Sequence, residues 1–140
     1  MNDRLIGIDF GLSKVGLSIS DPLKIISIPL KVIKYKNRQE LLIKLKEIAF
    51  ENDVRSFVIG YPLNMNNKKN EMTKLVDELF EELKNLNFNV FLQDERLSSE
   101  SAKKIMHEQN IKTGKNKEHI DLIASTIILQ SFLDKGDFND

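Results

Sequence analysis

Residues 5–20 read LIGIDFGLSKVGLSIS, and this stretch predicts two adjoining β-strands. An apolar run from Leu5 to Phe10 is followed by a glycine, and from Val15 to Ser20 apolar residues alternate with glycine and serine. A third β-branched run extends from Ile25 to Tyr35, where Pro29 indicates an edge strand or a bulge. The short connections between the three runs favour an antiparallel meander.

The later part of the chain alternates between helical and strand-like patterns. Helices are expected from Asn37 (as N-cap) to Asn52, from Met72 to Leu86, from Ser98 or Ser99 past Met106, and from Glu118 to Leu133; strands are expected from Ser56 to Gly60 and from Asn89 to Gln93. The last helix is apolar nearly all round, so we expect it to be buried. The order β-β-β-α-β-α-β-α-α predicts an α/β fold: a three-strand antiparallel meander plus two parallel strands, forming a mixed sheet with helices on both faces.

The composition fits a single folded domain over residues 1–140. The chain is 41% hydrophobic, which excludes a disordered protein. It has no cysteine, which excludes disulfide scaffolds, thiolate zinc sites and cysteine nucleophiles. No apolar run approaches the roughly 18 residues of a membrane helix, and no signal peptide is visible. We therefore expect a soluble cytoplasmic protein with no membrane partner.

Positive and negative charges balance, with 21 Lys and Arg against 21 Asp and Glu. The basic residues nevertheless cluster within residues 31–38, 68–74 and 103–117. A neutral protein with one basic face can bind a polyanion, weakly and with strong salt dependence. Charge alone favours the simpler interpretation, in which these are solvated surfaces.

Three carboxylate positions are unusual for their surroundings. Asp9 ends an apolar strand, Asp94-Glu95-Arg96 follows another, and Asp121 lies near the start of the most apolar helix. Each has a local explanation, namely turn hydrogen bonds, an ion pair with the neighbouring arginine, and the helix dipole. Alternatively, the three segments converge on one or two hard divalent cations such as Mg²⁺ or Mn²⁺, which can activate water against a phosphodiester.

Other catalytic patterns are missing from the sequence. It contains no Walker A motif, no Gly-x-Ser-x-Gly and no pair of histidines at helical ligand spacing. His107 and His119 have no evident partner, and we interpret both as solvent-exposed.

Four motifs in the same order resemble those of the YqgF/RuvX family and span nearly the whole chain. They are Gly7-Ile8-Asp9-Phe10-Gly11 continuing through Lys14-Val15-Gly16 to Ser20-Asp21, then Gly60-Tyr61-Pro62-Leu63-Asn64, Asp94-Glu95-Arg96-Leu97-Ser98-Ser99, and Asp121-Leu122-Ile123-Ala124 with residues 128–133. Each motif alone is weak, but four in order make a specific match. The resemblance implies an RNase H-like fold, with which the predicted element order agrees.

The resemblance also implies an acidic active site that uses Mg²⁺ or Mn²⁺. Asp9, Glu95 and Asp121 would be the catalytic and metal-binding acids, with Asp94 as an additional candidate ligand. The residues implied to contact nucleic acid are Lys14, Asn64, Arg96 and Lys117.

The sequence departs from the usual family pattern at a few positions, none of which is one of the three acids. Lys14 replaces an arginine, which keeps the charge but removes the bidentate fork. Asn66-Asn67 lies in a loop that often carries glycine, although asparagine tolerates left-handed geometry. Ser98-Ser99 replaces a threonine pair, and Ser125 replaces an alanine.

The function implied is that of a metal-dependent endonuclease that matures the 5′ end of pre-16S rRNA, either free or within a precursor ribosomal particle. One alternative is a Holliday-junction resolvase acting on branched DNA, which needs the same acids and should be a dimer with paired active sites. Another is a non-catalytic RNA- or ribosome-binding module. The sequence leaves the oligomeric state open.

Overall fold

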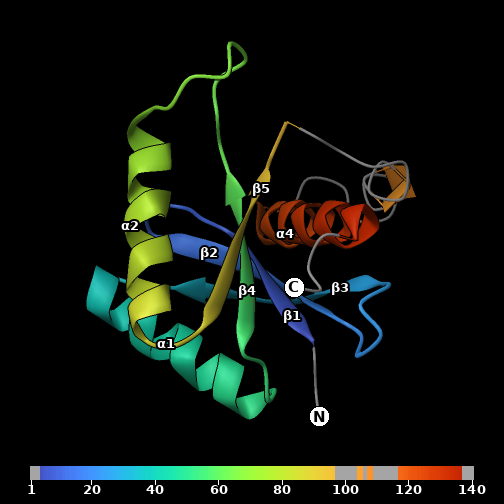
Figure 1. Ribbon diagram of the computed structural model, residues 1–140, viewed down its shortest axis with the longest axis horizontal. Coiled ribbons are helices and arrows are strands. Elements are labelled where there is room, and N and C mark those ends of the chain that lie inside the picture. The colour runs from blue at the N-terminus through green and yellow to red at the C-terminus, as the bar shows by residue number, and fades with distance from the viewer. Residues whose placement is uncertain (1–3, 97–103, 106, 109–116, 137–140) are drawn as a thin grey trace.

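Within the described residues, five strands form one mixed sheet in the order β3-β2-β1-β4-β5 (Figure 1). The structure is a computed structural model that describes residues 4–96, 104–105, 107–108 and 117–136. Its strands are β1 (Leu5–Asp9), β2 (Lys14–Ser20), β3 (Ser27–Lys34), β4 (Ser56–Tyr61) and β5 (Asn89–Asp94). The first three pair antiparallel, whereas β4 pairs parallel with β1 and β5 pairs parallel with β4. The predicted meander with two added parallel strands is confirmed.

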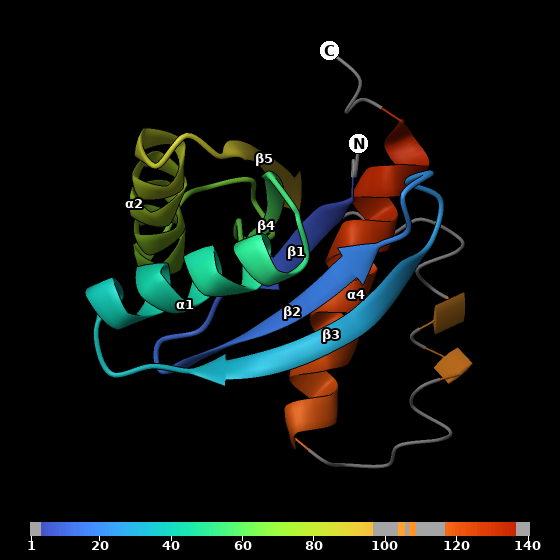
Figure 2. The same cartoon turned by 90° about the horizontal axis from the view of Figure 1, so that it is seen from below.

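Helices cover both faces of this sheet, as predicted (Figure 2). α1 (Arg38–Glu51) and α2 (Glu71–Asn85) lie on one face, and α4 (Lys117–Lys135) lies on the other. The predicted N-cap of α1 is confirmed, because the Asn37 side chain accepts a 2.9 Å hydrogen bond from a first-turn amide. The helix expected after Ser98 or Ser99 lies largely outside the described residues.

β3 differs from its predicted extent because a turn precedes it. Residues 21–26 fold around Asp21, whose carboxylate accepts hydrogen bonds from the amides of Leu23, Ile25 and Ile26. This turn delays the start of the strand from Ile25 to Ser27. The prediction from Pro29 is confirmed in both of its forms, since β3 is an edge strand and its register with β2 shifts by a bulge beside that proline.

The face under α1 and α2 is built from large apolar side chains. Alternate residues of β1, β2 and β4 point to this face and pack with both helices. The fully buried members include Ile6, Ile8, Val15, Leu17, Phe57 and Ile59 from the strands, Leu41 and Leu45 from α1, and Leu79 and Leu83 from α2. Burial on this scale is the main favourable term for the fold.

The face under α4 combines a smaller apolar cluster, which includes Leu5, Val58 and Leu129, with glycines that let the helix approach closely. A Cβ atom added at Gly7 would lie 2.8 Å from Leu129 Cβ, and one added at Gly16 would lie 2.3 Å from the Asp121 carbonyl oxygen. The expectation that the last helix is buried is confirmed for its second half, where residues 125–133 are all buried except one. No helix in the part of the chain that the structure describes is long and apolar enough to cross a bilayer.

Candidate active site

The strand ends place two of the predicted acids side by side. Asp9 is the last residue of β1, and Glu95 directly follows β5. Because β1, β4 and β5 run parallel, their carboxyl ends meet at one edge of the sheet. The Glu95 amide donates a 3.1 Å hydrogen bond to the Tyr61 carbonyl, which extends the pairing with β4 by one residue.

The side chains of Asp9 and Glu95 are joined by a hydrogen bond. Burial, the neighbouring charge of Glu95 and then that of Asp121 raise the pKa of Asp9 to about 7. Burial also raises the pKa of Glu95, and this effect is opposed by the hydrogen bond from Asp9. A carboxyl group with a pKa of about 7 is protonated in part of the molecules at neutral pH, so Asp9 carries less negative charge than an exposed aspartate does.

Asp121 approaches this pair from α4. Its charge acts on Asp9, and its backbone lies directly over Gly16 of β2, where any side chain would collide with it. The Lys14 Nζ atom lies 3.1 Å from Asp121 Oδ2, and both side chains of this ion pair are partly buried. That oxygen is buried and makes no hydrogen bond.

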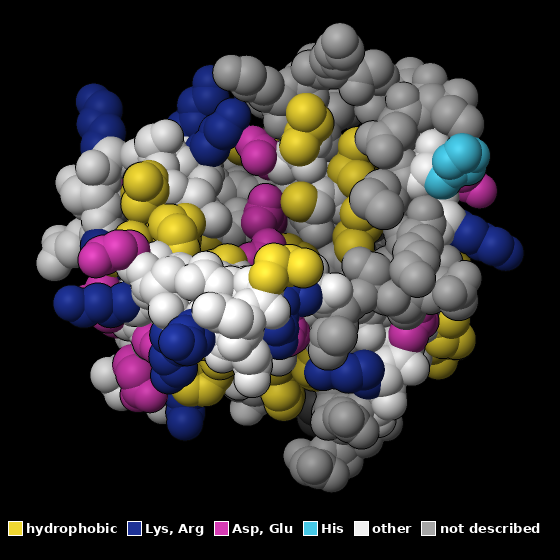
Figure 3. Space-filling model, turned by 90° about the horizontal axis from the view of Figure 1, so that it is seen from above, with side chains coloured by type: hydrophobic (Ala, Val, Ile, Leu, Met, Phe, Trp, Pro, Cys, Tyr) yellow, Lys and Arg dark blue, Asp and Glu magenta, His cyan; other side chains and the backbone are white. Residues whose placement is uncertain are grey.

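The acidic side chains form a group on the molecular surface at this end of the fold. Figure 3 shows acidic side chains in a column near the middle of a face of the molecule, with hydrophobic side chains to either side. Neutral protein surfaces rarely gather like charges unless a cation offsets them.

The donor chemistry of these acids fits a hard divalent cation. Every donor is a carboxylate oxygen, the acids lie close enough together to raise the pKa of Asp9, and the buried Asp121 Oδ2 has only the Lys14 ammonium beside it. As the side chains lie, no three carboxylates or histidines among the described residues have the spacing that holds a metal ion. The ammonium of Lys14 supplies positive charge beside Asp121 instead.

Asp94 has a different partner from the other acids. Its carboxylate accepts hydrogen bonds from Arg96 Nε at 3.0 Å and Nη2 at 2.6 Å, and from the Arg96 amide at 2.9 Å. These contacts hold the pKa of Asp94 below its usual value. The local ion pair considered for the Asp94-Glu95-Arg96 segment is therefore present, and Asp94 contacts the arginine.

Arg96 also connects β5 to the loop that follows β4. Its Nη2 donates to Asn67 Oδ1 at 3.0 Å, and its Nη1 donates to the Asn64 carbonyl at 3.4 Å. Asn67 has a φ of 66°, so asparagine does adopt the left-handed geometry expected in place of glycine. Asn64 makes contacts within the same loop, where its amide donates to the Lys68 carbonyl at 2.9 Å.

The residues implied to bind nucleic acid thus make internal contacts in this structure. Lys14 pairs with Asp121, Arg96 pairs with Asp94, and Asn64 shapes its loop. The side chain of Lys117, the first residue of α4, lies outside the described part of the chain. All but Lys117 nevertheless border the carboxyl ends of the strands.

Sequence reasoning missed the glycines that make room for the acids. Gly60 of β4 lies beneath the Glu95 side chain, since an added Cβ would be 2.9 Å from Glu95 Cγ. Gly16 has the same role beneath Asp121, and it pairs with Asp9 across the β1–β2 ladder. The alternation of apolar and small residues in β2 was a signal that could have identified Gly16.

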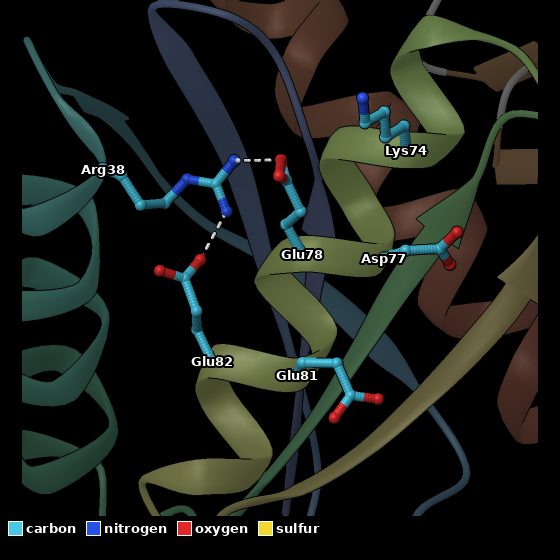
Figure 4. Close-up of a pocket in the computed structure, with 6 residues that line it drawn as sticks. All are labelled: Arg38, Lys74, Asp77, Glu78, Glu81 and Glu82. Carbon is cyan, nitrogen blue, oxygen red and sulfur yellow. Dashed lines mark hydrogen bonds and ion pairs between the residues drawn. The ribbon is translucent and has the colours of Figure 1, made fainter.

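A separate groove lies between α1 and α2, away from these acids. Arg38, Lys74, Asp77, Glu78, Glu81 and Glu82 line it, and Figure 4 shows Arg38 pointing toward the acids of α2. The Arg38 guanidinium lies 2.6 Å from Glu82 and 3.9 Å from Glu78. Since its main cation is already paired, the groove serves as a polar contact between helices.

Comparison with known proteins assigns the chain to a family. The family model described as "RuvX: Holliday junction resolvase" matches residues 3–135. The chain belongs to the RuvX family. The predicted resemblance is therefore confirmed.

Curated relatives of this RuvX chain match over nearly its whole length. A protein of Ruminiclostridium cellulolyticum is 39% identical over 134 residues, covering 94% of both chains. One of Mycoplasmopsis synoviae is 40% identical over 133 residues, covering 94% of this chain and 97% of its own. Both carry the name "Putative pre-16S rRNA nuclease".

Solved structures with the same fold are more distant in sequence. Thermus thermophilus RuvC in complex with a Holliday junction has a TM-score of 0.60 at 11% identity, covering 96% of this chain and 97% of its own. The fowlpox virus Holliday junction resolvase has a TM-score of 0.58 at 11% identity, covering 94% and 98%. These likenesses confirm the predicted RNase H-like α/β fold.

Proposed function

We propose that this protein is a divalent-metal-dependent endonuclease that matures the 5′ end of pre-16S rRNA by phosphodiester hydrolysis. The observation that carries the proposal is the meeting of Asp9, Glu95 and Asp121 at one end of the sheet, where burial and the neighbouring acids raise the pKa of Asp9. The names of the curated relatives support this choice of substrate.

In this proposal Asp9, Glu95 and Asp121 hold Mg²⁺ or Mn²⁺. A divalent cation at such a site supplies Lewis acidity, which activates water and offsets charge on the phosphate. For the three acids to hold a cation, Asp9 must be ionised and Asp121 must separate from Lys14. The released Lys14 ammonium then lies beside the acids, where it can contact a phosphate of the substrate.

Arg96 and its loop would position the RNA strand. The guanidinium holds residues 64 and 67 against the end of β5, so the loop keeps a fixed shape next to Glu95. Lys68, exposed in this loop, adds positive charge that the phosphate backbone favours. Because the protein is neutral overall, binding of RNA would depend on this local group of basic side chains. We therefore expect cleavage to weaken steeply as the salt concentration rises.

The test is cleavage of a pre-16S 5′-leader RNA with Mn²⁺ or Mg²⁺, beside a four-way DNA junction. Asp9→Asn should lower RNA cleavage by at least a hundredfold, because a neutral amide cannot replace the carboxylate toward the cation. Asp53→Asn is the matched control, since Asp53 is exposed, lies far from the acids and has a φ of 53° that asparagine tolerates. Circular dichroism checks that both variants fold. RNA cleavage that Asp9→Asn leaves unchanged would contradict the proposal.

A junction resolvase is the second candidate, favoured by the family description and by the two structural neighbours. It predicts that the junction alone is cut, symmetrically and by a dimer. If neither substrate is cut, the same pair of variants should be assayed on precursor ribosomal particles. Equal rescue of depleted cells by wild type and Asp9→Asn would instead indicate the non-catalytic binding module.

A further inference from the structure

Gln93 is a buried polar residue that the proposed mechanism does not use. It lies on β5, its side chain is 1% exposed, and its Oε1 atom has no hydrogen-bond partner. Its Nε2 atom makes one hydrogen bond, to the Asp94 carbonyl, at the long distance of 3.5 Å. Burying a carboxamide with so few partners is unfavourable, a cost that an apolar residue would avoid.

The pairing of the strands places Gln93 in one row with the acids. Asp9 pairs with Gly16 on one side, and Gly60 pairs with Gln93 on the other. The register of Ile8 with Ile59 puts Asp9 beside Gly60. Residues aligned across a sheet point to the same face, so Asp9 and Gln93 face α4 with only a glycine between them.

Glu95 fills the space above that glycine. Its Cγ and Cδ atoms lie 2.9 Å and 3.0 Å from the position of a Cβ added at Gly60. The Glu95 carboxyl group lies above Gly60 and is hydrogen-bonded to Asp9. It therefore lies between Asp9 and Gln93. Gln93 and Glu95 also point to the same face of the sheet, because they are two residues apart along β5 and its extension.

We propose that the Gln93 carboxamide oxygen is a further oxygen donor toward the cation held by Asp9, Glu95 and Asp121. The inference rests on the proposed function. An amide oxygen suits Mg²⁺ and Mn²⁺, and because it is neutral it adds a donor without adding to the repulsion among the three acids. It can act directly or through the water that such ions retain.

The distribution of unpartnered buried atoms supports this role. Among the described residues, three buried side-chain oxygens have no hydrogen-bond partner. Two of them border the Asp9–Glu95 pair: Gln93 Oε1, and Asp121 Oδ2, which is ion-paired with Lys14 at 3.1 Å. The third, Ser27 Oγ, lies at the opposite end of the sheet, where β3 begins. Ser27 is therefore a matched control for the loss of a buried, unpartnered oxygen.

The experiment measures Mn²⁺ binding by isothermal calorimetry and by the Mn²⁺-induced rise in Tm, using the full chain. Gln93→Met keeps the length of the side chain but removes the oxygen, so the Kd for Mn²⁺ should rise tenfold or more. Ser27→Ala should bind as wild type does. Gln93→Glu, which keeps an oxygen donor, should retain tight binding, and it tests the proposal independently if Gln93→Met folds poorly.

The outcomes separate this inference from the proposed function. If wild type binds Mn²⁺ and Gln93→Met binds equally well, the role of Gln93 is overturned and the acidic site stands. If Ser27→Ala weakens binding as much as Gln93→Met does, the effect is a general loss of packing and the inference again fails. If wild type binds neither Mn²⁺ nor Mg²⁺ at millimolar concentration, the proposed function and the role of Gln93 are both overturned.

Discussion

The same strands present different kinds of side chain to the two faces of the sheet. Toward α1 and α2 the strands present large side chains such as Ile8 and Phe57, which are fully buried. Toward α4 the same strands present some apolar side chains, such as Leu5 and Val58, together with glycine, serine and carboxylates, and at the glycines the helix contacts the backbone itself. The difference shows that one face carries most of the apolar burial, so the other can hold like charges and unpartnered oxygens at a cost the fold tolerates.

The largest expected effect comes from the apolar face. Phe57→Ala should lower the free energy of unfolding by about 3–5 kcal/mol, because it leaves a cavity among fully buried apolar side chains. The midpoint of urea denaturation measures this change. Phe50→Ala is the matched control, since Phe50 is 89% exposed and its loss should change stability by less than about 0.5 kcal/mol. Similar effects for the two variants would contradict the comparison.

Gly16→Ala tests how closely α4 must approach the polar face. The new methyl group would lie 2.3 Å from the Asp121 carbonyl oxygen, so α4 must move. We expect a loss of roughly 1–3 kcal/mol in urea denaturation, together with weaker Mn²⁺ binding as Asp121 is displaced. Unchanged stability and unchanged binding would show that the close contact is not needed to place the acid.

Asp9→Asn, unlike the two substitutions above, should raise the free energy of unfolding of the metal-free protein. The pKa of Asp9 is about 7 in the folded state and near 3.8 when unfolded, so the folded state binds more protons between these values. Its stability therefore falls as pH rises from about 4 to 7, and the variant should not show this fall. At pH 8, with a chelator present, we expect a gain of roughly 1–3 kcal/mol.

Asp21→Asn is the control for this pH dependence. Backbone amides hold the pKa of Asp21 below its usual value, so its ionised form stabilises the fold at neutral pH. Asparagine at this position should lower stability instead of raising it, as measured by urea denaturation across the same pH range. A gain in both variants would point to net charge, not to the crowding of acids.

The smallest expected effect tests the hydroxyl contacts under α4. Ser125 Oγ donates to the Gly7 carbonyl at 2.9 Å and lies 2.9 Å from Ser18 Oγ. Ser125→Ala should cost about 1 kcal/mol, the typical value of a buried hydrogen bond. A double-mutant cycle with Ser18→Ala, measured by urea denaturation, gives the coupling energy of the pair. Additive effects would show that the two hydroxyls act separately.

The fold could be predicted largely because its signals are local. The alternation in residues 15–20 gave the strand and its two faces, and Pro29 gave the edge position. The start of β3 could not be placed, because the turn around Asp21 depends on how one carboxylate bonds to several later amides. Helical periodicity likewise predicted α1 and α2, and Asn37 was predicted as the N-cap of α1.

The candidate site could be predicted only in part. Motifs identified the three acids, and parallel strands explain why Asp9 and Glu95 share one end of the sheet. The partners of these residues could not be predicted, since Lys14 meets Asp121 and Arg96 meets Asn67 only after distant segments have packed. Gln93 looked like the end of an apolar strand, and its role emerges only from the row it forms with Asp9.

The position of α4 also sets the order of events during synthesis. Ribosomes make the chain from the N-terminus, so β1 with Asp9 and β5 leading to Glu95 are complete before the helix that carries Asp121 exists. A nascent chain therefore has two of the three acids but cannot assemble the site until residues up to 135 have been made and α4 has docked on β1 and β2. Nuclease activity would then appear in one late step of synthesis. An incomplete chain would therefore be inactive while it is still bound to the ribosome, which is itself rich in RNA.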